Sequence, residues 1–579
     1  MEKGDYTVGD IYQGGYSSLS PSYGDVFQGY RVSAGSIGLT TDPRTANVLQ
    51  ETSTKLSTGV KQIELSAVSP EVFDSIPKQH LKELNRQSKL TGVDISVHAP
   101  VVEPSGITRE GFTESNREAA ERQMGSAVER SHEINPQGNI PVTFHSSAIL
   151  PGQIKPEKPE EVFVINSDTG SIHRLPLKER RFPGEAGPNI KQELTKINEE
   201  QWSQGKRSLS YYSDLGEDTI NRSEYLSRAA EAEEKAGKEL SEKEERARSS
   251  FNMGATFLDD SYRQLKEIFE LANKYGTEDD KKLLDGFAKN IKPKAEQINK
   301  TEDIYENVKL RKAIIDEGIK TFNKIKMPPK IFKQLDEFAK EKTTETFANI
   351  ALNSYEKFGS NAPIISIENP PIGGAFARGE ELREIVEKSR EKFVENAAKK
   401  GMSKSEAKEQ AEKLLGVTWD VGHINMLRKY GYKKEDIIKE TKKVAKFVKH
   451  VHLSDNFGFE HTELPMGMGN VPIKEIMEKL GEKGFEAKKI IEAGSWWQHF
   501  KTPPVQETLQ ALGSPIYSMK APYWNQTSGL WQGYFGGLGQ ILPQMGYETF
   551  GAGFSQLPTE LGGQRPGAGG ARMSGKPME

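Results

Sequence analysis

The sequence contains no cysteine, which excludes disulfides, thiolate metal sites and cysteine nucleophiles. Any bound metal ion would therefore have His, Asp or Glu ligands. The chain also lacks a run of about 18 strongly apolar residues, so we expect no ordinary membrane-spanning helix. Its first residues lack the apolar stretch of a secretory signal, which predicts a cytoplasmic protein.

A large excess of charge of either sign is absent as well. The 79 Lys and Arg residues nearly balance the 83 Asp and Glu residues, giving a formal net charge of −4. A near-neutral chain is not a bulk binder of polyanions, although a local basic face stays open. With 28% charged residues, the composition is typical of a globular protein with long solvated helices.

The two ends of the chain differ in composition from the rest. Residues 1–34 are rich in Tyr, Gly and Ser, residues 514–579 are rich in Gly, and both lack helical periodicity. We expect both to be flexible tails. Between Lys520 and Glu548 the second tail has no charged residue but several aromatic ones. The alternative interpretation of this tail is therefore a docking or membrane-surface segment.

Short apolar runs alternate with amphipathic helical patterns in residues 35–150 and 360–513. Eight of these runs have the length and composition of buried strands. They are residues 36–40, 60–66, 93–99, 140–146, 363–369, 415–421, 447–455 and 488–494. Eight strands alternating with helices predict a closed parallel α/β barrel, and the two segments have the roughly 250-residue length typical of one.

Residues 151–359 interrupt this pattern after the fourth predicted strand. The segment opens with a hairpin-like pattern whose turn reads SDTG, at residues 167–170. Highly charged helical patterns follow, with opposite charges at i,i+4 spacing, which favours long solvated helices. We predict a helical bundle or an antiparallel coiled-coil pair. It would act as a spacer, as an oligomerisation bundle or as an arm that grips the substrate.

Histidines and carboxylates stand where six successive predicted strands end. In a parallel barrel the C-terminal strand ends form the active-site rim. These six residues are His98, His145, Glu368, Asp420, His452 and Glu492. Two more histidines, His423 and His461, follow Asp420 and His452 in the next loops.

The rim residues predict a metal site built from nitrogen and oxygen ligands. Such a set suits Zn²⁺, Mn²⁺, Co²⁺ or Fe²⁺, and its five imidazoles make Mg²⁺ less suitable. The remaining histidines are interpreted as structural. They are His80, His132, His173, His450 and His499.

Seven short motifs contain or surround these residues. They are VHAP (97–100), FHSS (144–147), IENPPIGG (367–374), DVGH (420–423), HLSD (452–455), EHTELPMGMGN (460–470) and IEAG (491–494). In this order and spacing the sequence resembles the xylose isomerase-like TIM barrel superfamily. That superfamily includes endonuclease IV-type apurinic endonucleases as well as sugar and sugar phosphate isomerases and epimerases.

The resemblance to endonuclease IV implies two or three zinc ions and hydrolysis of phosphodiesters at abasic DNA, as in DNA repair. The implied first site is His98, His145 and Glu368; the second is Glu368, Asp420, His452 and Glu492; the third is His423, His461 and an Asp. Phe459 stands where that Asp is expected, so Glu460 or Glu463 would have to replace it. This activity is the leading hypothesis from the sequence.

The resemblance to the isomerases and epimerases implies one divalent ion on the second of these sites. Glu368 and Glu492 would then be the catalytic residues, because they would move protons on the sugar. Such an enzyme does not need the four histidines outside that site as a set, which favours the endonuclease. The third hypothesis is a non-catalytic barrel that serves as a scaffold.

Overall fold

The computed structural model describes residues 37–152, 161–177, 189–494, 496, 500 and 503–512. The two predicted tails lie outside these residues. Within the described part of the chain, no helix combines the length and apolarity needed to cross a membrane. The chain divides into two compact units, Glu157–Phe338 and the remainder.

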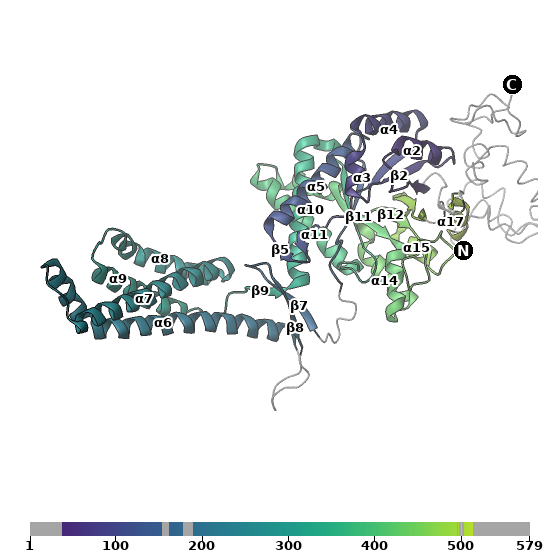
Figure 1. The fold of residues 1–579 in the computed structure, drawn as a ribbon. Helices are drawn as coiled ribbons and strands as arrows, with labels where there is room; N and C mark the ends of the chain where they lie inside the picture. The colour runs from purple at the N-terminus through teal and green to yellow at the C-terminus, as the bar shows by residue number, and fades with distance from the viewer. Residues whose placement is uncertain are drawn as a thin grey trace, which may run out of the picture. The chain divides into compact units, whose positions relative to one another are not determined.

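The first unit contains a closed barrel of eight parallel strands, as predicted (Figure 1). The strands are β1 (Ile37–Thr40), β2 (Gln62–Ser66), β3 (Asp94–His98), β6 (Pro141–His145), β10 (Ile364–Glu368), β11 (Leu415–Asp420), β12 (Val448–Leu453) and β13 (Lys488–Ile491). Each matches one of the eight apolar runs. Neighbours in the barrel follow chain order, and β13 closes it against β1.

Helices follow the strands and cover the outside of the barrel. They are α2 (Val48–Leu56), α3 (Pro70–Ser75), α4 (Lys78–Thr91), α5 (Glu114–His132), α10 (Leu335–Phe358), α11 (Gly379–Lys399), α12 (Lys404–Leu414), α13 (Val421–Asn425), α14 (Lys434–Val444), α15 (Ile473–Glu486) and α17 (Val505–Ala511). A small hairpin joins β4 (Ile107–Thr108) to β5 (Gly111–Phe112).

Local sequence signals define the ends of these helices. Ser69 caps α3 by accepting the Val72 N–H, and Pro70 occupies the first turn, where no N–H is needed. The residue before Pro77 is extended, which separates α3 from α4 within one continuous helical pattern. Gly92 ends α4 at φ 65°, a left-handed conformation that glycine adopts without strain.

Strand alternation sends every second side chain into the barrel interior. The rim layer contains the predicted ligands, and the residues two positions earlier form a second layer beneath it. That second layer is also polar: Glu64, Ser96, Thr143, Ser366, Thr418 and His450 are all buried. Hydrogen bonds connect it, with Thr418 Oγ1 2.8 Å from Ser366 Oγ and 2.9 Å from Thr143 Oγ1.

The second unit consists of a three-stranded sheet and four helices. Its strands are β7 (Glu161–Asn166), β8 (Ile172–Pro176) and β9 (Phe332–Gln334), and its helices are α6 (Ile190–Lys235), α7 (Glu242–Tyr275), α8 (Glu278–Ile298) and α9 (Ile304–Phe322). The predicted hairpin is confirmed as β7 and β8. The third strand, β9, comes from the far end of the insertion and pairs with β7.

The longest two helices, α6 and α7, pack against each other as an antiparallel pair. The charged helical pattern runs on through residues 227–251, but the chain turns back between Lys235 and Glu242. Gly237 has φ 73° in this turn. Ser241 then starts α7 with a capping box to Glu244. Helical charge patterning continues through the turn, so charge alone does not reveal it.

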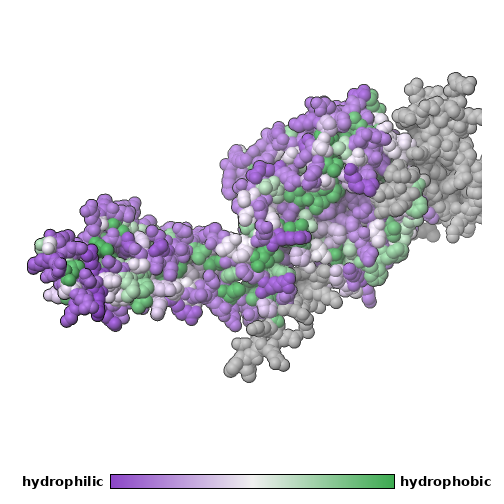
Figure 2. All heavy atoms as spheres, viewed as in Figure 1, coloured by the Kyte–Doolittle hydropathy of each residue, from purple (hydrophilic) through white to green (hydrophobic). Residues whose placement is uncertain are grey.

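The helices of this unit enclose a core made of apolar and aromatic side chains. Its buried members include Leu209, Phe251, Leu265, Ile314 and Phe322. On the face shown in Figure 2, hydrophilic residues predominate over α6 to α9. The unit is therefore an amphipathic bundle stabilised by ordinary hydrophobic burial.

Candidate metal centre

Glu368, at the end of β10, lies at the centre of the rim layer and is completely buried. Its Oε2 lies 3.2 Å from Nε2 of His98 and 3.3 Å from Nε2 of His145. Ligand atoms of these three residues all lie within 4.8 Å of one another. Strands β3, β6 and β10 are neighbours in the barrel, which is why residues 270 positions apart meet.

The hydrogen bonds of His98 show that the His98–His145–Glu368 group is suited to binding a cation. Its Nδ1 lies 3.0 Å from the Ala99 carbonyl oxygen, which only accepts, so Nδ1 carries the proton. In a neutral imidazole the lone pair is then on Nε2, facing Glu368 Oε2. That carboxylate oxygen is buried and accepts no hydrogen bond. Two lone pairs facing each other are stabilised by a cation between them.

A second group shares Glu368 and has four members: Glu368, Asp420, His452 and Glu492. His452 Nδ1 lies 2.8 Å from Oε1 of Glu368 and 3.3 Å from Oε1 of Glu492. Glu368 therefore presents one oxygen to each group. One imidazole and three carboxylates in this group are hard and borderline donors that suit a divalent ion.

Asp420 is held rigidly where β11 meets α13. Its Oδ1 accepts the His423 backbone N–H at 2.6 Å and the Ser454 hydroxyl at 3.2 Å. The Asn369 side chain pairs with the Asp420 backbone, accepting its N–H at 2.9 Å and donating to its carbonyl at 3.0 Å. These bonds orient the carboxylate before any ion binds, and such outer contacts tune metal affinity.

The two loop histidines meet beside this group. Nε2 of His423 and Nε2 of His461 are 2.8 Å apart, and His423 Nδ1 donates to the Asn369 carbonyl at 2.7 Å. Phe459, at the position of the expected third-site Asp, is 63% exposed. Glu463 Oε1 lies 3.7 Å from His461 Nε2. Among described residues, no group of three with ligand atoms within 4.8 Å includes this histidine pair.

Asp455, buried just after β12, organises the loop that carries His461 and Glu463. Its two carboxylate oxygens accept four backbone N–H groups at 2.8–3.0 Å, two per oxygen, and its own backbone pairs with Leu464. The loop is therefore folded back on itself. In this loop the backbone of Glu463 has a φ angle of 47°, an uncommon conformation for a residue with a side chain.

Burial and neighbouring charges shift the protonation of these groups in the metal-free protein. Burial lowers the pKa of His145 to about 3, so its imidazole is neutral near pH 7. Burial, followed by repulsion from His423, lowers the pKa of His461 to about 4. Neutral imidazoles are the form that binds metals.

Burial and neighbouring charges shift the pKa values of Glu368 and Glu492 in opposite directions. The pKa of Glu368 lies well below its ordinary value because the attraction of His452 and His145 outweighs the effect of burial. Burial raises the pKa of Glu492 well above its ordinary value despite the attraction of His452, and the charge of Glu368 adds to the rise. The centre thus holds two neighbouring carboxyl groups whose pKa values are shifted in opposite directions, a pattern common at functional sites.

A cavity of about 530 Å³ opens beside the rim layer. Five predicted ligands line it: His98, His145, His423, His461 and Glu492. Its other described walls include hydroxyl and apolar groups from the ends of β1 and β2. A volume of this size matches a small-molecule site.

All eight predicted site residues thus converge on the rim, and the structure adds others that sequence reasoning missed. Glu64 and His450 form a buried group with His452. His450 was interpreted as structural, and Glu64 was not considered because it lies before the end of β2. Alternation gives the signal for both, since each stands two residues before a rim position, where an apolar side chain is expected.

The closed parallel barrel and its rim of imidazoles and carboxylates define the class: β/α barrels with a candidate divalent-metal centre. Residues 377–513 match the family model described as xylose isomerase-like TIM barrel. The matched segment covers the part of the barrel that contains β11, β12 and β13, so this part of the chain is similar to that superfamily.

One curated relative and two solved structures are also similar. "Uncharacterized protein MJ1311" of Methanocaldococcus jannaschii is 32% identical over 80 residues, which is 14% of this chain. The chain spans about a quarter, 26%, of that relative. A D-tagatose 3-epimerase-like protein has a TM-score of 0.35 at 14% identity, over 83% of this chain and 99% of its own. An L-ribulose 3-epimerase has a TM-score of 0.35 at 8% identity, over 85% and 97%.

Proposed function

We propose that the barrel is a divalent-metal-dependent isomerase or epimerase of a small, sugar-type polyhydroxylated substrate. The observation that carries this proposal is the cavity of about 530 Å³ beside the candidate metal centre. It has the volume of a small-ligand site. Polar side chains of Thr40, Asp42 and Ser66 line it, and they are able to hydrogen-bond hydroxyl groups of a sugar.

The charge of the cavity lining argues against a polyanionic substrate. Among its described lining residues, Lys55 is the one Lys or Arg, and its side chain is buried, with 3% exposure. Nucleic acids are bound through several Lys and Arg contacts to phosphates. For this reason the abasic-DNA activity, the leading hypothesis from the sequence, takes second place here.

The residues present fit the proposed chemistry. A divalent ion held by Glu368, Asp420, His452 and Glu492 would polarise a carbonyl and an adjacent hydroxyl of the substrate. Glu492 borders the cavity, and burial raises its pKa, which favours a role in holding a proton and returning it to the substrate. Glu368 contacts the same nitrogen of His452, Nδ1, as Glu492 does, and its pKa is lowered, which favours the carboxylate form.

Deuterium exchange tests this proposal whichever sugar is the product. Metal-free full-length protein is loaded with Zn²⁺, Mn²⁺, Co²⁺ or Fe²⁺ and incubated in D₂O with a panel of aldoses and ketoses. We expect NMR to show deuterium at the carbon next to the carbonyl of at least one sugar. Glu492→Gln should abolish the exchange, whereas Glu118→Gln on the exposed face of α5 should not. Absence of exchange with every pair of metal and sugar would overturn the proposal.

A second candidate is hydrolysis of phosphodiesters at abasic DNA with two or three zinc ions. The specific observation that favours it is the shared Glu368, whose Oε2 faces His98 and His145 while Oε1 faces His452. A carboxylate between two ions is an arrangement of two-metal hydrolases. The His98–His145–Glu368 group has no assigned role in a one-metal isomerase.

Metal content and one substitution separate the two candidates. The isomerase predicts about one ion per chain, and the hydrolase two or three, with incision of an abasic duplex. His98→Ala should abolish such incision but leave sugar exchange nearly unchanged. Protein that purifies without metal and takes none up would support the non-catalytic scaffold.

A further inference from the structure

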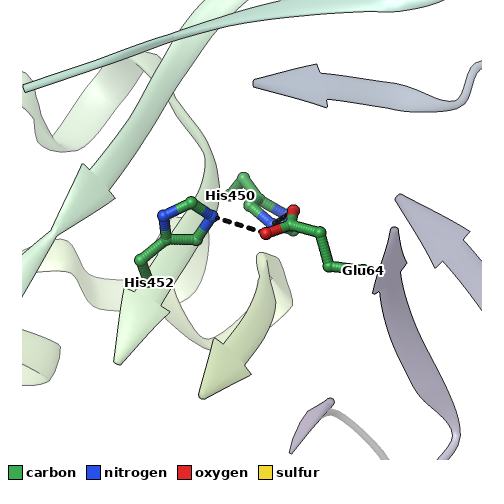
Figure 3. A group of neighbouring side chains, drawn as sticks. All are labelled: Glu64, His450 and His452. Carbon is green, nitrogen blue, oxygen red and sulfur yellow. Dashed lines mark hydrogen bonds and ion pairs between the residues drawn. The ribbon is translucent and has the colours of Figure 1, made fainter. Parts of the chain in front are cut away.

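Glu64 and two histidines of β12 form a buried group beneath the rim of the barrel. Figure 3 shows the Glu64 side chain reaching from β2 toward the imidazoles of His450 and His452. None of the three side chains is exposed. Because β1 and β13 separate β2 from β12 around the wall, this contact crosses the barrel interior.

The two oxygens of Glu64 have different partners. Oε2 lies 2.8 Å from His450 Nε2 and accepts the Ser96 hydroxyl at 3.0 Å. Oε1 lies 3.1 Å from His452 Nε2, a close contact between two buried atoms neither of which makes a hydrogen bond. His450 and Ser96 therefore fix the carboxylate plane, and they aim the free oxygen at His452.

The opposite side of the His452 ring faces the candidate metal group. Nδ1 lies 2.8 Å from Glu368 and 3.3 Å from Glu492. A neutral imidazole has one N–H and one lone pair. A carboxylate beside Nε2 favours the proton on that nitrogen, which leaves the lone pair on Nδ1 for a metal ion.

We propose that Glu64 is a positioning residue that holds His452 in the Nε2–H tautomer and orients its Nδ1 toward the metal ion. This inference rests on the part of the proposed function that places an ion on the Glu368–Asp420–His452–Glu492 group. Carboxylates that accept the second N–H of a metal-bound histidine typically change metal affinity by about 10- to 100-fold. His450 and Ser96 support Glu64, so the contact chain runs from the second polar layer to the rim.

The test measures Zn²⁺ binding to metal-free full-length protein by calorimetric titration. Glu64→Gln keeps the size of the side chain but offers an acceptor oxygen to only one of the two imidazoles. We expect its affinity for the ion at His452 to fall by about 10- to 100-fold with an unchanged number of ions per chain. Unchanged affinity would overturn the inference.

Matched controls separate positioning from general damage. Glu440→Gln alters another buried carboxylate, one that pairs with Arg378 on the outside of the barrel, and should leave Zn²⁺ affinity unchanged. Ser96→Ala removes one support of Glu64 and should weaken binding less than Glu64→Gln does. A Glu64→Gln protein that loses one whole ion would instead identify Glu64 as a ligand and refute the positioning role.

A second measurement does not depend on the variant folding. The ¹⁵N chemical shifts of the His452 ring in the Zn²⁺-loaded wild-type protein should show a proton on Nε2 and none on Nδ1. A proton on Nδ1 would overturn the inference. Wild-type protein that binds Zn²⁺ in this way but exchanges no sugar protons would refute the isomerase alone, so the two failures are distinguishable.

Discussion

The interiors of the two units differ in chemistry. The barrel interior buries carboxylates, imidazoles and hydroxyls in two successive layers, whereas the core of the helical unit is built of apolar and aromatic side chains. Burying polar groups costs free energy unless each is paired. The barrel centre therefore buries groups that can bind a cation at a cost in desolvation energy, whereas the helical unit gains stability from apolar burial.

Glu368→Gln should strongly reduce metal binding and turnover in the barrel. This carboxylate belongs to both ligand groups, so its loss should lower metal affinity and turnover by more than the roughly 100-fold limit typical of outer contacts. Metal content after dialysis and the deuterium-exchange assay provide the measurements. Glu118→Gln on exposed α5 is the control. Retention of tightly bound metal by the Glu368 variant would contradict the assignment.

Phe251→Ala should damage the helical unit alone. Phe251 is buried in the core of that unit, and its ring centre lies 4.5 Å from that of Tyr305. Truncation should cost about 3–5 kcal/mol of unfolding free energy for this unit. Denaturant unfolding and Zn²⁺ titration measure the two effects. Met253→Ala, at a largely exposed position of the same helix, should change stability by less than about 0.5 kcal/mol. Loss of Zn²⁺ binding in the Phe251 variant would show that the units are not independent.

Acid should destabilise the metal-free barrel through His145. Its pKa is lowered from 6.5 to about 3 by burial, so the unfolded chain binds the proton more readily. Stability should therefore fall as the pH drops through this window, by at most about 1.4 kcal/mol per pH unit. Urea midpoints at pH 6.5 and 4.5 measure the slope. The slope should be shallower in His145→Gln, and an equal slope would assign the pH dependence to other groups.

The smallest effects concern two glycines of the helical unit. A Cβ at Gly237 meets no atom within 4 Å, but its φ of 73° is unfavourable for alanine. We expect Gly237→Ala to destabilise by about 1 kcal/mol. Gly286 lies within α8, also in open space, so Gly286→Ala should stabilise by about 0.5–1 kcal/mol. Thermal unfolding measures both, and shifts of the same sign would refute the conformational explanation.

The barrel was predictable from the sequence because its signals are local. Runs such as residues 93–99 and 363–369 are short, apolar and followed by helical patterns, so each run predicts a strand without information from the rest of the chain. The helical unit was harder to resolve. The turn between α6 and α7 carries the same charged residues as the helices, and the three-residue β9 is too short for a periodic signal. Its pairing with β7 depends on contact across the whole insertion.

The candidate site likewise contains residues that the sequence predicts and one residue that it does not. His98, Glu368 and Asp420 were found because each ends a predicted strand, and the barrel topology brings strand ends together. Glu64 was missed because its importance depends on a contact across the interior to His452. The roles proposed for Glu64 and for the rim residues depend on which ion binds, and no spacing in the sequence specifies that ion.

The pairing of β7 with β9 also bears on how such a chain arises. Val164 lies opposite Gln334, so the incoming and outgoing segments of the helical unit run side by side, about 5 Å apart. The two ends of the inserted helical segment are thus held together within the sheet of their own unit. A segment added or replaced between these two strands would leave the order of all eight barrel strands unchanged.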